Sequence, residues 1–429
     1  MPSSPFRPIV QADPGNPPGE APARRWTTML LATACGLIVA NLYYAQPLVR
    51  PIGAALGLPA AADGLVVTMA QVGYGLGLLL IVPLGDLVEN RRLAVGVIAV
   101  GAVALLCAAL STRPLPFLVA ALFIGLGSVA VQILVPYAAH LAPEESRGRA
   151  VGNVMSGLML GIMLARPLAA ITAELSSWHT VFYLSATVML LLAVLLNRVL
   201  PARTPTSDLG YGRLLASMAH LARTTPVLRR RALYHALLFG AFSLFWTTVP
   251  LLLAGPAFRL SQAGIALFAL AGVAGAVAAP IAGRVADRGW SRTATGFAMA
   301  AVALAFPLTE VHLSGSSLRL ALLVAAAILL DFGVSANMTL GQQAIFRLGD
   351  EHRGRLNGLY MATFFTGGAI GSALGGLLYA RGGWALTSSA GLVLPVIALV
   401  YFATERIPDQ TLPRSGAAAE PPTKAVPSR

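Results

Sequence analysis

The stretch "EESRGRAVGNVMSGLMLGIMLARPLAAI" (residues 144–171) aligns without gaps on "DEHRGRLNGLYMATFFTGGAIGSALGGL" (residues 350–377). The Arg-Gly-Arg triplet at 147–149 falls on the triplet at 353–355, and the glycines that follow keep the same spacing. A long repeat in the same orientation predicts a chain built from two similar units in tandem.

A second pair of stretches supports this duplication. "VPLGDLVENRR" (82–92) and "GRVADRGWSR" (283–292) each follow an apolar run and place an aspartate, Asp86 or Asp287, before clustered arginines. The two pairs occur in the same order along the chain. A tandem repeat with this order is typical of membrane proteins made of two parallel six-helix halves.

The composition is that of a membrane protein. Hydrophobic residues make up 56% of the chain and charged residues 11%, whereas soluble domains carry about 25% charged residues. Apolar stretches of about 20 residues, long enough to cross a ~30 Å hydrocarbon core as helices, recur along the whole chain. We expect twelve spans, at about 26–45, 63–85, 93–112, 117–141, 150–175, 181–199, 233–254, 263–286, 293–311, 319–346, 356–380 and 385–404.

The basic residues indicate the orientation of these spans. Loops on the side of the termini hold most of the 30 basic residues, and the opposite loops hold only Arg50, Arg113, Arg259, Arg319 and Arg381. The positive-inside rule therefore places both termini in the cytoplasm. The net charge of +13 then reflects topology and attraction to anionic lipid, so we expect no nucleic-acid partner.

The expected organisation is an all-α membrane protein with two parallel-repeated six-helix bundles. In the segment between the bundles, Leu214, Leu215, Met218 and Leu221 share one helical face, which predicts an amphipathic helix on the membrane surface or on the bundle. The expected parts are a disordered tail (1–25), an N-terminal bundle (26–199), a linker (200–232), a C-terminal bundle (233–405) and a C-terminal tail (406–429).

Residue types exclude many sites for chemistry. The only lysine is Lys424, so Walker-type phosphate loops and Schiff-base lysines are absent. Cys35 and Cys107 both lie in apolar runs, which implies no disulfide framework or thiolate metal site. All six histidines are expected at span ends or in loops, in solvated or capping roles. We therefore expect no enzyme activity, no cofactor and no metal.

With these features the sequence resembles the major facilitator superfamily over about residues 26–405. The family motif G-x-x-x-D-R-x-G-R-R after the second span is kept in the second copy as Gly283, Asp287, Arg288 and Arg292. The first copy departs from it. "ANLYYAQPLV" (40–49) and "FSLFWTTVPLLL" (242–253) also look like a bacterial branch grouped with drug and sugar efflux permeases.

The loop motifs suggest a gate. An aspartate at a helix end can face a helix N-terminus and nearby guanidinium groups, so such a cluster could latch the cytoplasmic ends of the two bundles. The alternative is that these charges only set the topology. The gate residues expected are Asp86, Arg91, Arg92, Arg147, Arg149, Gly283, Asp287, Arg288, Arg292, Arg353 and Arg355.

Small residues indicate close helix packing. In this superfamily spans 2, 5, 8 and 11 form the interface between halves, and GxxxG spacing allows backbones to approach. We expect these faces to rock against each other, although ordinary tight packing would give the same pattern. The glycines concerned are Gly73 and Gly77, Gly157 and Gly161, and Gly367, Gly371 and Gly375.

Polar residues within the spans are few and are the candidates for a substrate and coupling site. The resemblance implies that spans 1, 4, 7 and 10 line a central cavity, where all of these residues except Arg166 of span 5 fall. The alternative is that they hydrogen-bond neighbouring helices. The candidates are Arg166, Asp331, Asn41, Tyr44, Gln46, Gln132, Trp246, Asn337 and Gln342.

Arg166 lies in span 5, where efflux members of the superfamily have G-x-x-x-G-P and this chain has Gly161, Ala165, Arg166 and Pro167. A guanidinium at this depth is costly in lipid. We expect it to pair with Asp331, with an anionic substrate, or with backbone carbonyls freed by Pro167, in that order.

The function expected is export of a small organic solute across the bacterial plasma membrane, driven by protons, by a protein that works as a monomer. One alternative is uptake of an anionic metabolite held by Arg166. A further alternative is a transporter-like sensor or scramblase without coupled transport.

Overall fold

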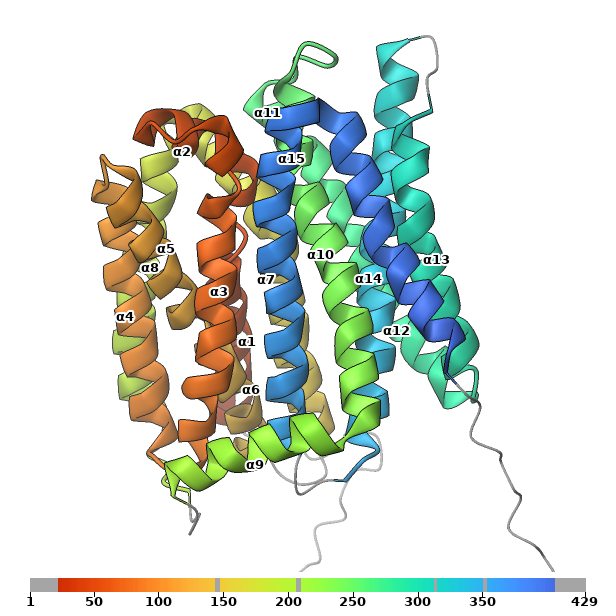
Figure 1. Ribbon diagram of the computed structural model, residues 1–429. Helices are drawn as coiled ribbons and strands as arrows, with labels where there is room; N and C mark the ends of the chain where they lie inside the picture. The colour runs from red at the N-terminus through yellow and green to blue at the C-terminus, as the bar shows by residue number, and fades with distance from the viewer. Residues whose placement is uncertain (1–21, 143–146, 206–209, 312–314, 350–352, 406–429) are drawn as a thin grey trace, which may run out of the picture.

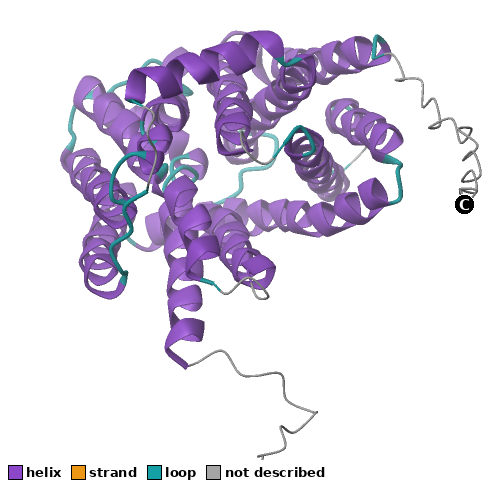
Figure 2. Ribbon diagram, turned by 90° about the horizontal axis from the view of Figure 1, so that it is seen from below, coloured by secondary structure: helices purple, strands orange, loops and turns teal. Residues whose placement is uncertain are grey.

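The computed structural model describes residues 22–142, 147–205, 210–311, 315–349 and 353–405, and all regular secondary structure among them is helical (Figure 1). Figure 2 views the molecule from the end at which α9 lies, here called the α9 end. The short helices α2 and α11 lie at the opposite end, here called the α2 end (Figure 1).

The N-terminal helices run from α1 to α8. The long apolar members alternate in direction between the two ends of the molecule, and 3-10 turns connect some of them. The elements are α1 (Pro22–Ala40), η1 (Gln46–Leu48), α2 (Val49–Leu56), η2 (Ala60–Ala62), α3 (Leu65–Leu80), η3 (Val82–Asp86), α4 (Asn90–Leu110), α5 (Pro114–Ser128), α6 (Ala130–Leu141), α7 (Arg147–Leu175) and α8 (Trp178–Val199).

The C-terminal helices run from α10 to α15, after the connecting helix α9. In α15, non-helical angles at Gly382 and at Gly383, where φ is +60°, separate two helical arms that were expected as two spans. The elements are α9 (Tyr211–Thr224), α10 (Pro226–Ala254), α11 (Gln262–Ala269), η5 (Leu270–Val273), α12 (Ala274–Asp287), α13 (Ser291–Thr309), α14 (Ser316–Phe346) and α15 (Arg353–Ala403).

Eight helices in the described ranges are long and apolar enough to cross a membrane, and two shorter apolar helices lie at Trp26–Ala40 and Gln262–Gly272. Every expected span contains helix, but four are interrupted, and the second of them breaks at Ile81 between α3 and η3. The first ends at Ala40, where the Asn41 side-chain amide donates to the carbonyls of Leu37 and Ile38. The fourth breaks at Val129, and the eighth breaks at η5.

Glycine contacts correct one sequence-based expectation. Gly157 and Gly161 of α7 pack on the backbone of α1, and Gly367 and Gly371 of α15 pack on α10. Gly73 of α3 likewise packs on α5. These glycine faces therefore hold helices together within the N-terminal or the C-terminal group, and the expectation that they slide between the groups was wrong. The close backbone contact between the groups is made instead by Gly64 at the start of α3, which packs against Ser372 and Gly376 of α15.

Contacts between the two groups are made by other residues. α3 packs along α15, and α7 packs against α11. Gln71 of α3 donates to Ser243 of α10 (2.8 Å), and the hydroxyls of Thr68 and Ser372 lie 2.8 Å apart. Short polar side chains, rather than the GxxxG faces, therefore join the two groups of helices in the half of α3 nearer the α2 end.

α9 crosses the α9 end of the molecule from one group to the other (Figure 1). Tyr211 donates to the carbonyl of Leu80 in α3 (2.8 Å), and Ser217 accepts from Arg355 of α15 (2.5 Å). Leu214 and Met218 are buried, as expected for an amphipathic helix that packs on the bundle.

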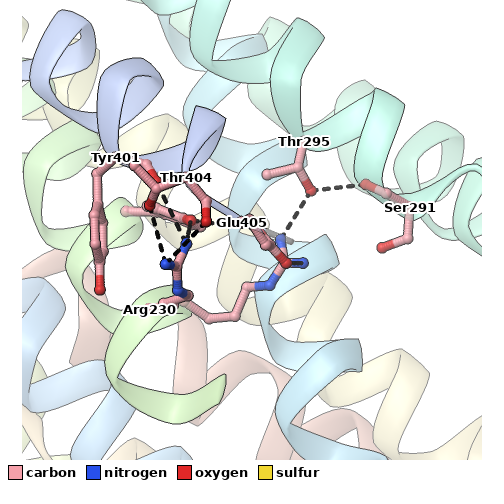
Figure 3. A network of polar contacts seen from close by, with 8 residues as sticks. Arg230, Ser291, Thr295, Tyr401, Thr404 and Glu405 are labelled. Atoms are coloured by element: carbon pink, nitrogen blue, oxygen red, sulfur yellow. Dashed lines mark hydrogen bonds and ion pairs between the residues drawn. The ribbon is translucent and has the colours of Figure 1, made fainter. Parts of the chain in front are cut away.

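A polar network joins three C-terminal helices at the α9 end (Figure 3). Arg231 of α10 pairs with Glu405 beyond α15 (3.0 Å) and donates to Thr295 of α13 (3.1 Å). The adjacent Arg230 donates to the hydroxyl of Thr404 (3.0 Å). These bonds hold the ends of α10, α13 and α15 together.

Candidate functional site

Arg166 is buried inside the molecule, with 3% of its surface exposed. Its Nε donates to Gln46 Oε1 (2.7 Å), and its guanidinium carbon lies 4.1 Å from the centroid of the Trp246 ring. The rings of Tyr43 and Phe242 lie at 5.3 and 5.2 Å. Cation–π contacts with three rings offset part of the cost of removing the guanidinium from water.

Asp331 lies on the other side of Trp246. The indole Nε1 donates to Asp331 Oδ1 (2.8 Å), and the carboxylate is 4% exposed. Trp246 of α10 therefore contacts both buried charges, with its ring face toward the guanidinium and its N–H toward the carboxylate. The site draws on η1 and α7 from the N-terminal helices, and on α10 and α14 from the C-terminal helices.

Gly272 packs closely against both charged groups, at a position where no side chain would fit. A β-carbon at this position would lie 2.7 Å from Asp331 Oδ2 and 3.0 Å from Arg166 Nη1. Gly272 belongs to η5, the break in the eighth expected span, so the interruption brings a side-chain-free backbone to the site. The sequence analysis did not place this glycine in the site.

Arg166 and Asp331 share this site without a direct ion pair. Both are described residues, and their side chains do not approach within the 4.0 Å of an ion pair. The partner that Arg166 does have, Gln46, was a candidate in its own right but was not among the three partners expected for the arginine. Trp246 and Gly272 separate the opposite charges.

Two buried donors at the site have no acceptor. Arg166 Nη2 and Gln46 Nε2 are inaccessible to solvent and have no hydrogen-bond partner. An unpaired buried donor costs about 1–3 kcal/mol. The adjacent cavity has room for about one water molecule. The residues that line it are Gln46, Pro47, Arg166, Trp246, Val249, Pro250, Leu253, Ile265, Phe268 and Ala269.

Other candidates from the sequence have protein partners elsewhere. Asn41 is bonded to Ser185, and Gln132 donates to Tyr74 (3.1 Å). Gln342 of α14 donates to Asn357 of α15 (3.2 Å). These contacts are those of hydrogen-bonding side chains between helices. Tyr44 is half-buried, next to Tyr43 in the chain.

One histidine is not where the sequence suggested. His235 is fully buried within α10, and its Nδ1 lies 3.2 Å from the amide nitrogen of Asn337. Its ring stacks on Phe364, with centroids 4.2 Å apart. The expectation that all six histidines lie in loops or at span ends was wrong here, because α10 extends to Pro226, beyond the apolar run that marked the span.

The expected gate residues are only partly connected. Arg91 and Arg92 both pair with Glu89 of their own loop, at 3.0 and 2.8 Å. Burial raises the pKa of the Asp86 carboxyl, and the charges of Arg355 and Arg203 partly oppose this rise. Among the described residues, no ion pair joins the two groups of helices at this end.

The remaining gate residues have separate surroundings. Arg353 and Arg292 lie near the rings of Phe346 and Phe402, at 5.5 and 5.7 Å. Arg149 and Arg288 are exposed, and a β-carbon on Gly283 would lie 3.6 Å from Gln343 Nε2. The side chains of Arg147 and Asp287 lie outside the described part of the structure.

Long apolar helices around a buried pair of charges define a multi-pass membrane transporter. The sequence profile of the Major Facilitator Superfamily matches residues 29–318 and 257–427. The chain belongs to this superfamily.

Known relatives agree with this assignment. The uncharacterized transporter YgaY of Escherichia coli O157:H7 is 40% identical over 375 residues, which cover 87% of this chain and 94% of that protein. The chloramphenicol efflux pump Rv0191 of Mycobacterium tuberculosis is 27% identical over 61% of this chain and 63% of its own length. The crystal structure of the nucleoside transporter NupG superposes with a TM-score of 0.70 at 15% identity, over 88% of this chain and all of that chain (100%). That likeness concerns the fold.

Proposed function

We propose that this protein exports a small organic solute in exchange for protons, by alternating access. The observation that carries the proposal is the buried Arg166–Trp246–Asp331 cluster between the N-terminal and C-terminal helices. A carboxylate among apolar helices is stable only when it is paired or protonated. Asp331 is therefore the group to bind the proton, and the similarity to a chloramphenicol efflux pump supports the direction.

The proposed topology has twelve spans, with both termini on the cytoplasmic side of the bacterial plasma membrane. Six spans from α1–α8 and six from α10–α15 form the two bundles, and α9 lies on the cytoplasmic face between them. This arrangement is supported by the bias of basic residues toward the loops at the α9 end. We propose that the protein functions as a monomer.

In the proposed cycle, the proton and the solute compete for Asp331. The polar bonds from Gln71 to Ser243 and between Thr68 and Ser372 close the end that carries α2. The basic loops at the other end act as the cytoplasmic gate, where the charges of Arg355 and Arg203 act on Asp86.

Uptake of an organic anion together with protons is the second candidate. It is favoured by the unpaired donors on Arg166 and Gln46, which could bind a carboxylate. In that case an anion and a proton on Asp331 would bind together and move in the same direction.

The test is proton flux in proteoliposomes that hold a pH-sensitive dye. Under an imposed pH gradient, a transported solute should dissipate the gradient in vesicles with the wild-type protein. Vesicles with Asp331→Asn should not respond. Solute loaded inside the vesicles and driven out by an acidic exterior indicates export. Accumulation of solute under the same gradient indicates uptake. Lipid scrambling without flux of any solute would contradict both candidates.

A further inference from the structure

We propose that the solute is a zwitterion with an apolar body, about the size of an apolar amino acid. Its acceptor end would bind Arg166 and Gln46, and its cationic end would bind Asp331. This inference rests on the proposed function and specifies the ligand of the same site.

The acceptor end follows from the two unpaired donors. Gln46 Oε1 is occupied by Arg166 Nε, which fixes the side-chain amide so that its Nε2 is the free donor. Arg166 Nη2 and Gln46 Nε2 are both buried and both lack an acceptor. Two donors from adjacent side chains match the two oxygens of a carboxylate.

The cationic end follows from Asp331. Its Oδ1 is taken by Trp246, and its Oδ2 has only the backbone of Gly272 between it and Arg166 Nη1, so a ligand reaches Oδ2 when the two groups of helices move apart at this point. A primary ammonium group donates charge-assisted hydrogen bonds to a carboxylate, which are roughly twice as strong as bonds between neutral groups. Binding of that ammonium would exclude a proton from Asp331, which is the competition that exchange requires.

The charge of the whole site favours a net-neutral solute. One cation and one anion, Arg166 and Asp331, lie on either side of Gly272 without forming an ion pair with each other. A zwitterion would pair each of them, whereas an anion alone would leave Asp331 beside a second negative charge unless it took up a proton.

The apolar residues that line the cavity are the reason to expect an apolar body in the solute. Besides Gln46, Arg166 and Trp246, the cavity is lined by apolar side chains, among them Val249, Leu253, Ile265 and Phe268. In this conformation the cavity has room for about one water, so the solute enters when the two groups of helices move apart.

The experiment measures binding of three probes to the purified full-length protein in detergent. The probes are L-leucine, 3-methylbutylamine, which lacks its carboxylate, and 4-methylpentanoate, which lacks its amine. Radiolabelled leucine gives the affinity, and the other two are measured as competitors. We expect leucine to bind at least about tenfold more tightly than either analogue, since each analogue leaves one buried charge unpaired.

Two variants should change the preference in opposite ways. Arg166→Met should remove the advantage of leucine over the amine, and Asp331→Asn should remove its advantage over the carboxylate. The control Ser156→Ala, an exposed position on the same helix as Arg166, should leave all three affinities unchanged. Thermal unfolding of each variant shows that it is folded.

Each alternative outcome would overturn the inference. Equal binding of 4-methylpentanoate and leucine, with proton uptake, would identify an anion site. If 3-methylbutylamine binds as tightly as leucine, the carboxylate contributes nothing and Arg166 and Gln46 do not bind it. If no probe binds but other solutes drive proton flux, the inference that the solute is a zwitterion is wrong, whereas the proposal that the protein is a transporter stands. If leucine binds as expected without any flux, transport fails and the site assignment stands.

Discussion

At the scale of single residues, the site depends on how one guanidinium is kept inside an apolar protein. Arg166 has one hydrogen bond, from Nε to Gln46, and three aromatic rings within about 5 Å of its guanidinium carbon. If every N–H group of the Arg166 guanidinium were bonded to the protein, none would be left to bind a ligand. Partial pairing leaves donors for a ligand, at a cost in stability.

The first residue-scale prediction concerns the electrostatic link between Arg166 and Asp331. Arg166→Gln or Asp331→Asn alone leaves one buried charge without its opposite and should destabilise the protein by about 3 kcal/mol. The double variant should lose much less than the sum of the two, but should not recover proton flux. Thermal unfolding in detergent, read as a double-mutant cycle, measures this coupling. Additivity within about 0.5 kcal/mol would show that the two charges are independent.

The second residue-scale prediction concerns Gly272. In Gly272→Ala the new methyl group would lie 2.7 Å from Asp331 Oδ2 and 3.0 Å from Arg166 Nη1, so both side chains must shift. Proton flux and leucine binding should fall at least about tenfold, since the displaced charges lose about 1.4 kcal/mol of ligand interaction. The matched control is Gly96→Ala in α4, where a β-carbon meets open space. It should keep full flux, and equal behaviour of the two variants would remove Gly272 from the site.

At the scale of helices, interruptions place groups where a straight helix could not. The end of α1 at Ala40 lets the chain turn through η1 and brings Gln46 to Arg166. The break at η5 brings Gly272 between the charges. Non-helical backbone is tolerated at membrane depth when it is buried in protein or lines a cavity, which is the case at both sites.

The element-scale prediction concerns the network at the ends of α10, α13 and α15 (Figure 3). Glu405→Gln removes the ion pair with Arg231, whose side chain is only 11% exposed, and should lower stability by about 1–2 kcal/mol. Arg231→Met should cost a similar amount, and the double variant should cost less than the sum. Thermal unfolding measures this, with Arg229→Met as a control on the same helix. An unchanged unfolding temperature in Glu405→Gln would show that the pair contributes nothing to holding these helices.

At the scale of the whole molecule, the two groups of helices are joined by polar side chains and by the close packing of Gly64 against Gly376. Backbone contacts at Gly161 and Gly371 lie within the two groups of helices, whereas polar side chains such as Gln71 and Ser243 join the groups. Side-chain hydrogen bonds between helices in a membrane are worth about 0.6 kcal/mol each, so they can break and re-form during a cycle. α9 spans both groups at the other end and would follow their motion.

The prediction at this scale concerns the conformational equilibrium. Gln71→Leu combined with Thr68→Val removes two bonds between the groups and should favour opening at the α2 end by about 1 kcal/mol. The measurement is thiol labelling of Ala369→Cys, a buried α15 position whose carbonyl accepts from Thr68, after Cys35 and Cys107 are replaced. Labelling should be about fivefold faster. The control Ser389→Ala should not change it, and an unchanged rate in the double variant would show that these bonds do not hold the end closed.

The sequence by itself determined the superfamily, the helical class and the two buried charges. Hydrophobic length, repeated motifs and a charge in an apolar run are local signals, so they can be read along the chain. The placement of Arg166 and Asp331 in one site followed from their depth in the repeated helices.

Only the tertiary structure decided which partners these residues have. Gln46 became the partner of Arg166 because α1 ends early, and Trp246 joined the two charges because α10 presents its ring between them. The glycine faces were assigned to the wrong contacts, and His235 to the wrong surroundings, for the same reason. Helical spacing shows which residues share a face, but the neighbour of that face is set by packing between segments far apart in sequence.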